Sequence, residues 1–260
     1  MAEPVYSAVV RVALGTFRAL DLRLDVRGHE HVPATGGAVV VVNHTGYLDF
    51  ALAGVPFWQA QRRLVRFMAK QEVFAHPAGG PLMRAMKHIP VDRESGGQAF
   101  RDAVAVLKGG ELVGVFPEAT ISRSFRLKTF KPGAVQMARA ASVPVLPVAL
   151  WGSQRVLTKG RRPSLRDARH VPVSIEVGAP LDPRAGGDPA AELRVRLDAL
   201  LAQAQERYPA APGDAGAWWL PAHLGGSAPT VEEADRLDAA DAEARALRRA
   251  RERGEPRPRP

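Results

Sequence analysis

The chain contains no cysteine among its 260 residues. Disulfide frameworks, thiolate metal sites and cysteine nucleophiles are therefore excluded. It also lacks an apolar run of about 18 residues, the length that a membrane-spanning helix needs. Residues 4–20 come nearest, but Arg11 and Arg18 interrupt them. No small-residue cleavage site follows an apolar core, so we do not predict a signal peptide.

Residues 4–20 instead have the composition of an amphipathic helix. We predict that this helix lies on a membrane surface. An ordinary helix packed on the protein core is the alternative.

Apolar residues make up 46% of the chain, which indicates a globular protein with a sizeable core. The net charge is +9, and residues 231–260 hold eight acidic and eight basic residues, so the excess lies in residues 1–230. A basic body suits anionic lipid, the phosphates of coenzyme A or nucleic acid. A coding bias toward arginine would give the same composition without any partner.

Residues 38–50, A-V-V-V-V-N-H-T-G-Y-L-D-F, are the stretch around which the chain is organised. The four valines predict a strand that is buried on both faces. His44 follows that strand, and catalytic groups in α/β sheets gather at such strand ends. A turn lets Asp49 fold back toward His44, where a carboxylate would fix the tautomer of the imidazole. A structural histidine is the alternative.

Strands and helices alternate along the chain. Further strands are predicted at 22–26, 63–69, 89–92, 112–116, 145–150 and 171–177, and helices at 47–58, 77–87, 97–108, 132–141 and 188–207. This pattern predicts an α/β fold with a largely parallel central sheet flanked by helices, preceded by the N-terminal amphipathic helix.

The C-terminal part differs in composition. We predict one domain over residues 1–208, then a linker at 209–229 that is rich in proline and glycine and carries Trp218-Trp219 as a candidate docking point. Thr230 and Glu233 form a capping box that begins a charged helical tail, residues 230–260, whose end we expect to be disordered.

Four blocks resemble the glycerolipid acyltransferase family, in the family's order and over roughly residues 25–180. They are N-H-T-G-Y-L-D, I-P-V-D-R at 89–93, F-P-E-A-T and V-P-V-L-P-V-A at 143–149. Two positions depart from the family pattern: Ala119 replaces a glycine, and Ile121 stands where arginine is usual. Arg123 is a candidate to supply that charge.

The resemblance implies a membrane-associated O-acyltransferase. It would move an acyl chain from acyl-coenzyme A or an acyl carrier protein to the sn-2 hydroxyl of lysophosphatidic acid, which makes phosphatidic acid. His44 would take the proton from the hydroxyl and Asp49 would orient His44. A thioester is already activated, so neither a cofactor nor a metal is expected.

The acceptor phosphate needs a cation. Arg93 is the first candidate, because a guanidinium matches two phosphate oxygens. Glu118 would hold Arg93 or an acceptor hydroxyl, and a plain Arg93–Glu118 salt bridge is the alternative. Further substrate-binding candidates are Thr120, Lys70 and Lys131.

Two basic segments, residues 122–131 and 155–169, suit an anionic membrane surface. We therefore expect a peripheral protein on the cytoplasmic face of the cell membrane. Solvated loops are the alternative, and no recognition motif supports binding of nucleic acid.

Three other functions stay open. The first keeps the chemistry but uses another lysophospholipid or a glycolipid as acceptor. The second is a metal-dependent hydrolase built on His44, Asp49 and Glu118, which lacks a second histidine at ligand spacing. The third is a non-catalytic basic protein that docks on lipid.

Overall fold

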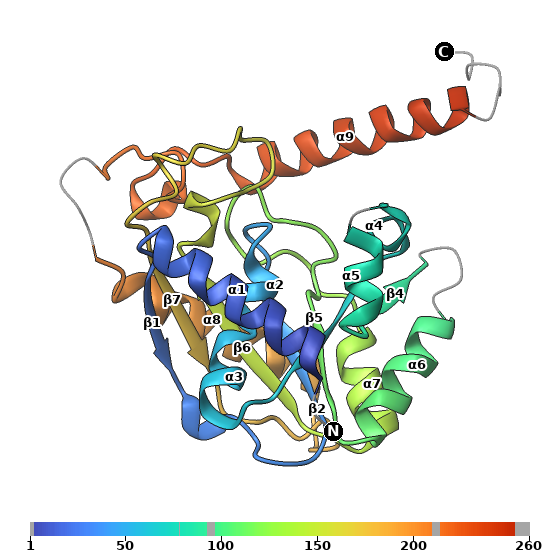
Figure 1. Ribbon diagram of the computed structural model, residues 1–260. Coiled ribbons are helices and arrows are strands. Elements are labelled where there is room, and N and C mark those ends of the chain that lie inside the picture. The colour runs from blue at the N-terminus through green and yellow to red at the C-terminus, as the bar shows by residue number, and fades with distance from the viewer. Residues whose placement is uncertain (1–2, 78, 93–96, 210–213, 253–260) are drawn as a thin grey trace. The chain divides into compact units, whose positions relative to one another are not determined.

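A computed structural model of the chain describes residues 3–77, 79–92, 97–209 and 214–252. The chain divides into two compact units (Figure 1). The first comprises Met1–Ile121 and Leu127–Pro209, and the second comprises Ser122–Arg126 and Ala210–Pro260. The domain end at residue 208 and the start of the tail at residue 230 remain predictions from the sequence.

The first unit is built on one sheet. Its strands lie in the order β1 (Arg23–Arg27), β7 (Pro172–Val177), β6 (Val145–Trp151), β2 (Ala38–Val42), β5 (Leu112–Val115), β3 (Val65–Lys70) and β4 (Ile89–Val91). All neighbours are parallel except β6 and β7. The prediction of an α/β fold with a largely parallel sheet is confirmed.

Strand β2 is the centre of this sheet. Val39 pairs with Val113 of β5 on one side and with Val145 of β6 on the other. All five residues of β2 are buried. The valine run forms a central strand because β-branched side chains pack well on both faces of a sheet that is covered on both sides.

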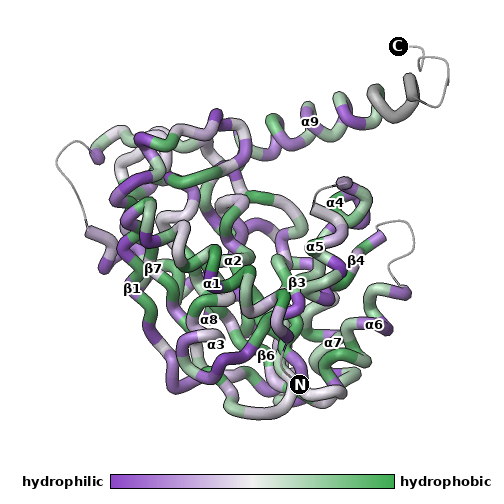
Figure 2. Tube along the Cα trace, viewed as in Figure 1, coloured by the Kyte–Doolittle hydropathy of each residue, from purple (hydrophilic) through white to green (hydrophobic). Residues whose placement is uncertain are grey.

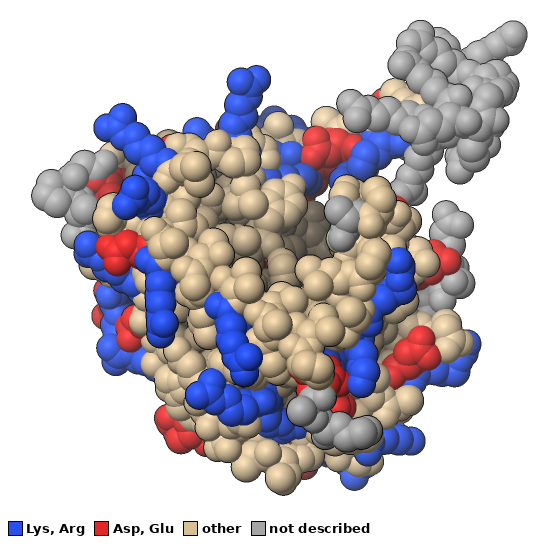
Figure 3. Space-filling model, viewed as in Figure 1, with Lys and Arg blue, Asp and Glu red and all other residues tan. Residues whose placement is uncertain are grey.

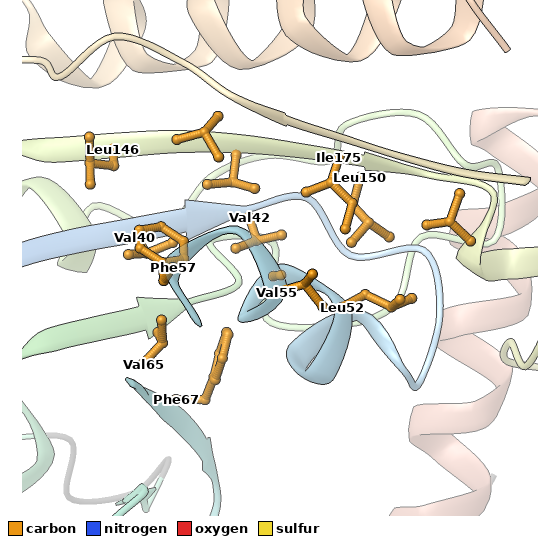
Figure 4. Packing of buried hydrophobic residues seen from close by; sticks show 14 of the residues in the cluster. Val40, Val42, Leu52, Val55, Phe57, Val65, Phe67, Leu146, Leu150 and Ile175 are labelled. Carbon is orange, nitrogen blue, oxygen red and sulfur yellow. The ribbon is translucent and has the colours of Figure 1, made fainter. Parts of the chain in front are cut away.

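One face of the sheet is covered by α1 (Pro4–Ala19), α2 (Asp49–Ala53) and α3 (Val55–Gln61), which lie in front of it in Figure 1. Val40 and Val42 of β2 pack there in one cluster with Leu52 and Phe57 (Figure 4). Side chains alternate along a strand, so Val39 and Val41 face the other side.

Helices also cover that other side. α7 (Gly133–Ala141) packs on β2 and β6, and α8 (Pro189–Glu206) packs on β6 and β7. α6 (Gly97–Lys108) packs on α7, β4 and β5. Figure 2 shows the hydrophobic residues concentrated in the central strands between these layers.

The helices differ from the prediction in two places. The segment 47–58 forms two short helices, α2 and α3, because Pro56 in the first turn of α3 has no N–H to continue α2. The sequence reading missed α4 (Gln71–Ala75), which precedes α5 (Gly79–Ala85). A helix of little more than one turn is too short for a helical period to show in the sequence.

The second unit contains η3 (Ala222–Leu224) and α9 (Val231–Glu252), a helix in which hydrophilic residues alternate with small apolar ones (Figure 2). Within it, Thr230 N donates to Glu233 Oε2 at 2.9 Å and Glu233 N donates to Thr230 Oγ1 at 3.2 Å, so the predicted capping box is present. Trp218 contacts Phe125, with ring centroids 6.4 Å apart.

Candidate active site

Five strand ends meet at one edge of the sheet. Strands β6, β2, β5, β3 and β4 are neighbours in that order and run parallel, so their carboxyl ends lie on the same side. His44 follows β2, Glu118 follows β5, and Ser153, the first residue of η2 (Ser153–Arg155), follows β6. Because β2 lies between β5 and β6, residues distant in sequence flank His44 on both sides.

Asn43 determines where the chain leaves strand β2. Its side-chain Nδ2 donates to Leu150 O at 2.9 Å, and Leu150 N donates to Asn43 Oδ1 at 2.7 Å. The side-chain amide thus takes over the pairing that the backbone of β2 makes with β6 up to Val42. The backbone of His44 is released from the ladder at this point.

His44 and Asp49 make the predicted contact. His44 Nδ1 lies 2.9 Å from Asp49 Oδ2, and the exposed fraction of the side chain is 19% for His44 and 0% for Asp49. An ionised carboxylate only accepts hydrogen bonds, so Nδ1 carries the proton and Nε2 presents its lone pair. The imidazole is stacked on Phe116, with centroids 4.1 Å apart and planes at 20°.

The Asp49 carboxylate is satisfied by four donors. Besides His44, Oδ2 accepts from Thr45 N at 2.7 Å and from Gly46 N at 2.8 Å, and Oδ1 accepts from Ser153 Oγ at 2.5 Å. A buried carboxylate is tolerated only with such compensation. The carboxylate is therefore held in one position and orients the imidazole in turn.

The segment after β6 supports the turn from His44 to Asp49. Thr158 Oγ1 donates to Thr45 O at 2.6 Å, and Tyr47 N donates to Leu157 O at 2.9 Å. The fit is close at Gly46, where a Cβ would lie 2.9 Å from Leu157 O. Sequence reasoning missed Ser153 and Thr158. The one signal for Ser153 was its position just after a predicted strand, and Thr158 had none.

Glu118 contacts the backbone of the same turn. It is buried, and its carboxylate accepts from His44 N and from Lys128 N, both at 3.0 Å. Burial raises the pKa of Glu118 to about 7, although the hydrogen bonds from these two amides lower it. Both oxygens are used to hold backbone, which differs from the expected contact with an acceptor hydroxyl.

The other candidates are less closely tied to His44. Arg93 lies outside the described residues. Lys70, the last residue of β3, and Lys131 are both exposed, and Lys131 N donates to Pro117 O at 2.9 Å beside Glu118. Thr120 is half-buried in the loop after β5. None of these three makes a hydrogen bond to His44 within the described residues.

The structure shows the surroundings of the two positions that depart from the family pattern, Ala119 and Ile121. Ala119 has a φ of 56°, in the left-handed region that glycine adopts without strain. Arg123 lies 3.2 Å from Asp238 and 2.6 Å from Asp241, within the second unit. Arg123 is thus engaged with α9, and the structure gives no support to its supplying the charge missing at Ile121.

Among residues 3–77, 79–92, 97–209 and 214–252, no three His, Asp or Glu side chains are placed to hold a metal ion. The alternative of a metal-dependent hydrolase therefore has no ligand set within this part of the chain. The same part contains no helix both long enough and apolar enough to cross a bilayer.

Comparison with known proteins identifies the family of the chain. Residues 23–151 match the Acyltransferase family. The chain is 33% identical over 141 residues to 1-acyl-sn-glycerol-3-phosphate acyltransferase of Bacillus subtilis. This alignment covers 52% of this chain and 68% of that protein. A chloroplastic 1-acyl-sn-glycerol-3-phosphate acyltransferase of Brassica napus is 30% identical over 143 residues, 53% of this chain and 40% of that protein.

The fold also has a solved counterpart. The crystal structure of the 1-acyl-sn-glycerophosphate (LPA) acyltransferase of Thermotoga maritima aligns with a TM-score of 0.63 and 23% identity, over 78% of this chain and 81% of that one. The block residues, the sheet and the sequence relatives agree, and the chain belongs to the glycerolipid acyltransferase family and is an acyltransferase.

Proposed function

We propose that the chain transfers an acyl group from acyl-coenzyme A, or from an acyl carrier protein, to the sn-2 hydroxyl of lysophosphatidic acid. The names of its relatives in Bacillus subtilis and Brassica napus support this acceptor. The observation that carries the chemistry is the contact between His44 Nδ1 and the buried Asp49 carboxylate at 2.9 Å. Such a pair is built to remove a proton from a hydroxyl.

In the proposed reaction, His44 Nε2 removes the proton of the acceptor hydroxyl while its oxygen attacks the carbonyl carbon of the thioester. A C–O bond forms and the C–S bond breaks. The imidazolium returns its proton to the departing thiolate, so the enzyme ends in its starting state. Asp49 stabilises the imidazolium and keeps the Nδ1–H tautomer.

The acceptor phosphate is proposed to bind at the same edge of the sheet. Lys70 ends β3, so it lies at the carboxyl edge of the sheet that carries His44. Arg93, outside the described residues, comes two positions after β4 in the sequence. Lys131 and Thr120 belong to the loop after β5. These groups are candidates to neutralise the phosphate, whereas the contacts of Glu118 favour a role in holding the His44 turn.

We also propose peripheral association with the cytoplasmic face of the cell membrane. Helix α1 buries Tyr6 and Phe17 but leaves Val5 47% and Val12 70% exposed. Figure 3 shows Lys and Arg side chains over α1 and α3 beside an uncharged, hollowed area between α1 and α4. Exposed apolar side chains bordered by cations suit an anionic bilayer surface.

The test is steady-state kinetics with radiolabelled acyl-coenzyme A and a panel of acceptors: lysophosphatidic acid, other lysophospholipids and a glycolipid. His44→Ala should reduce kcat by about 10²–10⁴-fold. The matched control is His170→Ala, which removes a histidine from an exposed pair with Asp21 at 2.7 Å. Near-normal turnover of a folded His44→Ala variant would disprove the mechanism.

The acceptor is tested separately. If Arg93 binds the phosphate, Arg93→Ala should raise KM for lysophosphatidic acid more than KM for the acyl donor, and Arg93→Lys should restore it only in part. Faster turnover of a phosphate-free acceptor would assign another substrate while leaving the His44 chemistry in place. If Arg93→Ala changes the KM values for acceptor and donor equally, Arg93 does not bind the phosphate, and Lys70 and Lys131 are the next candidates.

A further inference from the structure

A basic groove lies between α1 and α3, apart from the residues that hold His44. Its volume is about 540 Å³, and its walls are formed by Arg11, Leu14, Gly15, Arg18, Trp58 and Arg62. A volume of this size falls within the range of small-molecule sites, which is about 300–1,000 Å³. We call these six residues the arginine groove.

The sequence of α1 places its part of the groove on one stripe. Arg11, Gly15 and Arg18 are four and three residues apart, so they follow one another along the same helix side. The two arginines are about 10 Å apart along the helix axis. Leu14 packs against the hydrophobic core beside them, so the groove has an apolar floor and cationic walls.

The third arginine comes from the end of α3. Arg62 lies over the ring of Trp58, with its guanidinium carbon 5.0 Å from the ring centroid. Trp58 is only 9% exposed and therefore holds this guanidinium in place. The groove thus has one ordered cation facing the two of α1.

The three guanidinium groups have no carboxylate partner within the part of the chain that the structure describes. Other arginines in the fold do: Arg66 contacts Glu3 at 2.6 Å, and Arg123 contacts Asp241 at 2.6 Å. Three unneutralised cations around one groove repel one another and create a positive potential that an anion relieves.

Gly15 keeps the groove open. Glycine inside a helix is less favourable than alanine, because it loses more backbone freedom on folding. Packing does not require it here, because a Cβ at residue 15 would have no atom within 4 Å. A longer side chain at residue 15 would instead fill part of the groove.

We propose that the arginine groove binds the phosphate headgroup of an anionic phospholipid, as a site separate from the acceptor site. Guanidinium groups match phosphate oxygens in pairs. A lipid fits better than a soluble phosphate, because Val12 on the same helix is 70% exposed and would meet acyl chains beside the headgroup. The inference rests on the proposed membrane association and deepens it.

The test measures binding of the full chain to vesicles of phosphatidylcholine, with and without phosphatidylglycerol, in the absence of acyl donor and acceptor. Arg11→Ala and Arg62→Ala should each weaken binding to the anionic vesicles about fivefold or more. Gly15→Gln should weaken it at least as much without a change of charge, and glutamine is a good helix former, so the fold is kept. Arg23→Ala, an exposed arginine on β1, is the control for loss of one charge.

If Gly15→Gln binds the anionic vesicles as well as wild type, or if Arg23→Ala weakens binding as much as the groove variants do, the protein is held by its overall positive charge. Either result would overturn the site. Displacement from the vesicles by soluble glycerol 3-phosphate or coenzyme A would also overturn it, since the groove would then bind a free phosphate. Because no acyl transfer is measured, an inactive enzyme with groove-dependent vesicle binding would disprove the proposed reaction and leave this site standing.

Discussion

The hydroxyl of Ser153 donates a 2.5 Å hydrogen bond to Oδ1 of Asp49, the carboxylate whose other oxygen holds His44. The two residues are 104 positions apart in the chain and meet because β6 is the neighbour of β2. Ser153 is fully buried. Its hydroxyl also lies 3.1 Å from Thr45 Oγ1, and it makes no hydrogen bond to His44 within the described residues. We therefore expect Ser153 to act on the reaction by positioning Asp49 and the turn after His44.

Removing this hydroxyl should slow the reaction without weakening substrate binding. Hydrogen bonds to charged groups contribute about 1.5–3 kcal/mol, so Ser153→Ala should lower kcat by about tenfold to a hundredfold with KM for both substrates unchanged. Ser164→Ala, near the surface, is the control. A raised KM with normal kcat would instead place Ser153 in substrate binding.

Glu118 should make stability fall as pH rises. Its pKa in the folded protein is about 7 because it is buried, against 4.5 when exposed. Between these values the unfolded chain releases the proton first, so stability is lost from pH 4.5 to 7, by about 3 kcal/mol in all. Thermal unfolding of Glu118→Gln should lack this decline, and exposed Glu206→Gln should retain it. A decline that persists in Glu118→Gln would contradict the assignment.

His88 should act in the opposite direction. Its Nδ1 accepts from Phe67 N at 3.0 Å, and burial, assisted by Arg66, lowers the pKa of His88 from 6.5 to about 4. The unfolded chain gains its proton first as pH falls, so stability is lost from pH 6.5 to 4.

His88→Asn keeps an acceptor near Nδ1 and removes the titration. Thermal unfolding of this variant should show less acid loss than wild type over the same window, whatever its absolute stability. The opposing slopes of Glu118 and His88 partly cancel in wild type, so each shows most clearly when the other is replaced. An unchanged acid slope in His88→Asn would count against a neutral His88.

Ala119→Gly should stabilise the protein. A left-handed conformation costs a non-glycine residue about 1–2 kcal/mol, and Ala119 has a φ of 56°. After allowing for the larger entropy of glycine in the unfolded chain, we expect a gain of about 1 kcal/mol in denaturant unfolding. Ala105→Gly, at an exposed position in the middle of α6, should lose a similar amount. Equal effects at both positions would mean that backbone conformation is not the cause.

The elements of the fold were predictable where their signals are local. The valine run identified β2, and helical spacing identified α6 with the observed bounds. The division between α2 and α3 and the single turn of α4 were missed, because a proline break and a five-residue helix leave little periodic signal.

The sequence by itself made the contact between His44 and Asp49 predictable, since five residues that include a turn can bring these side chains together. Only the tertiary structure decided that Glu118 holds the amide of His44 and that Ser153 holds Asp49. Those contacts depend on the order of strands in the sheet, which places β5 and β6 on either side of β2. Hydrophobic periodicity predicts that a strand is buried, but it does not indicate which strands lie beside it.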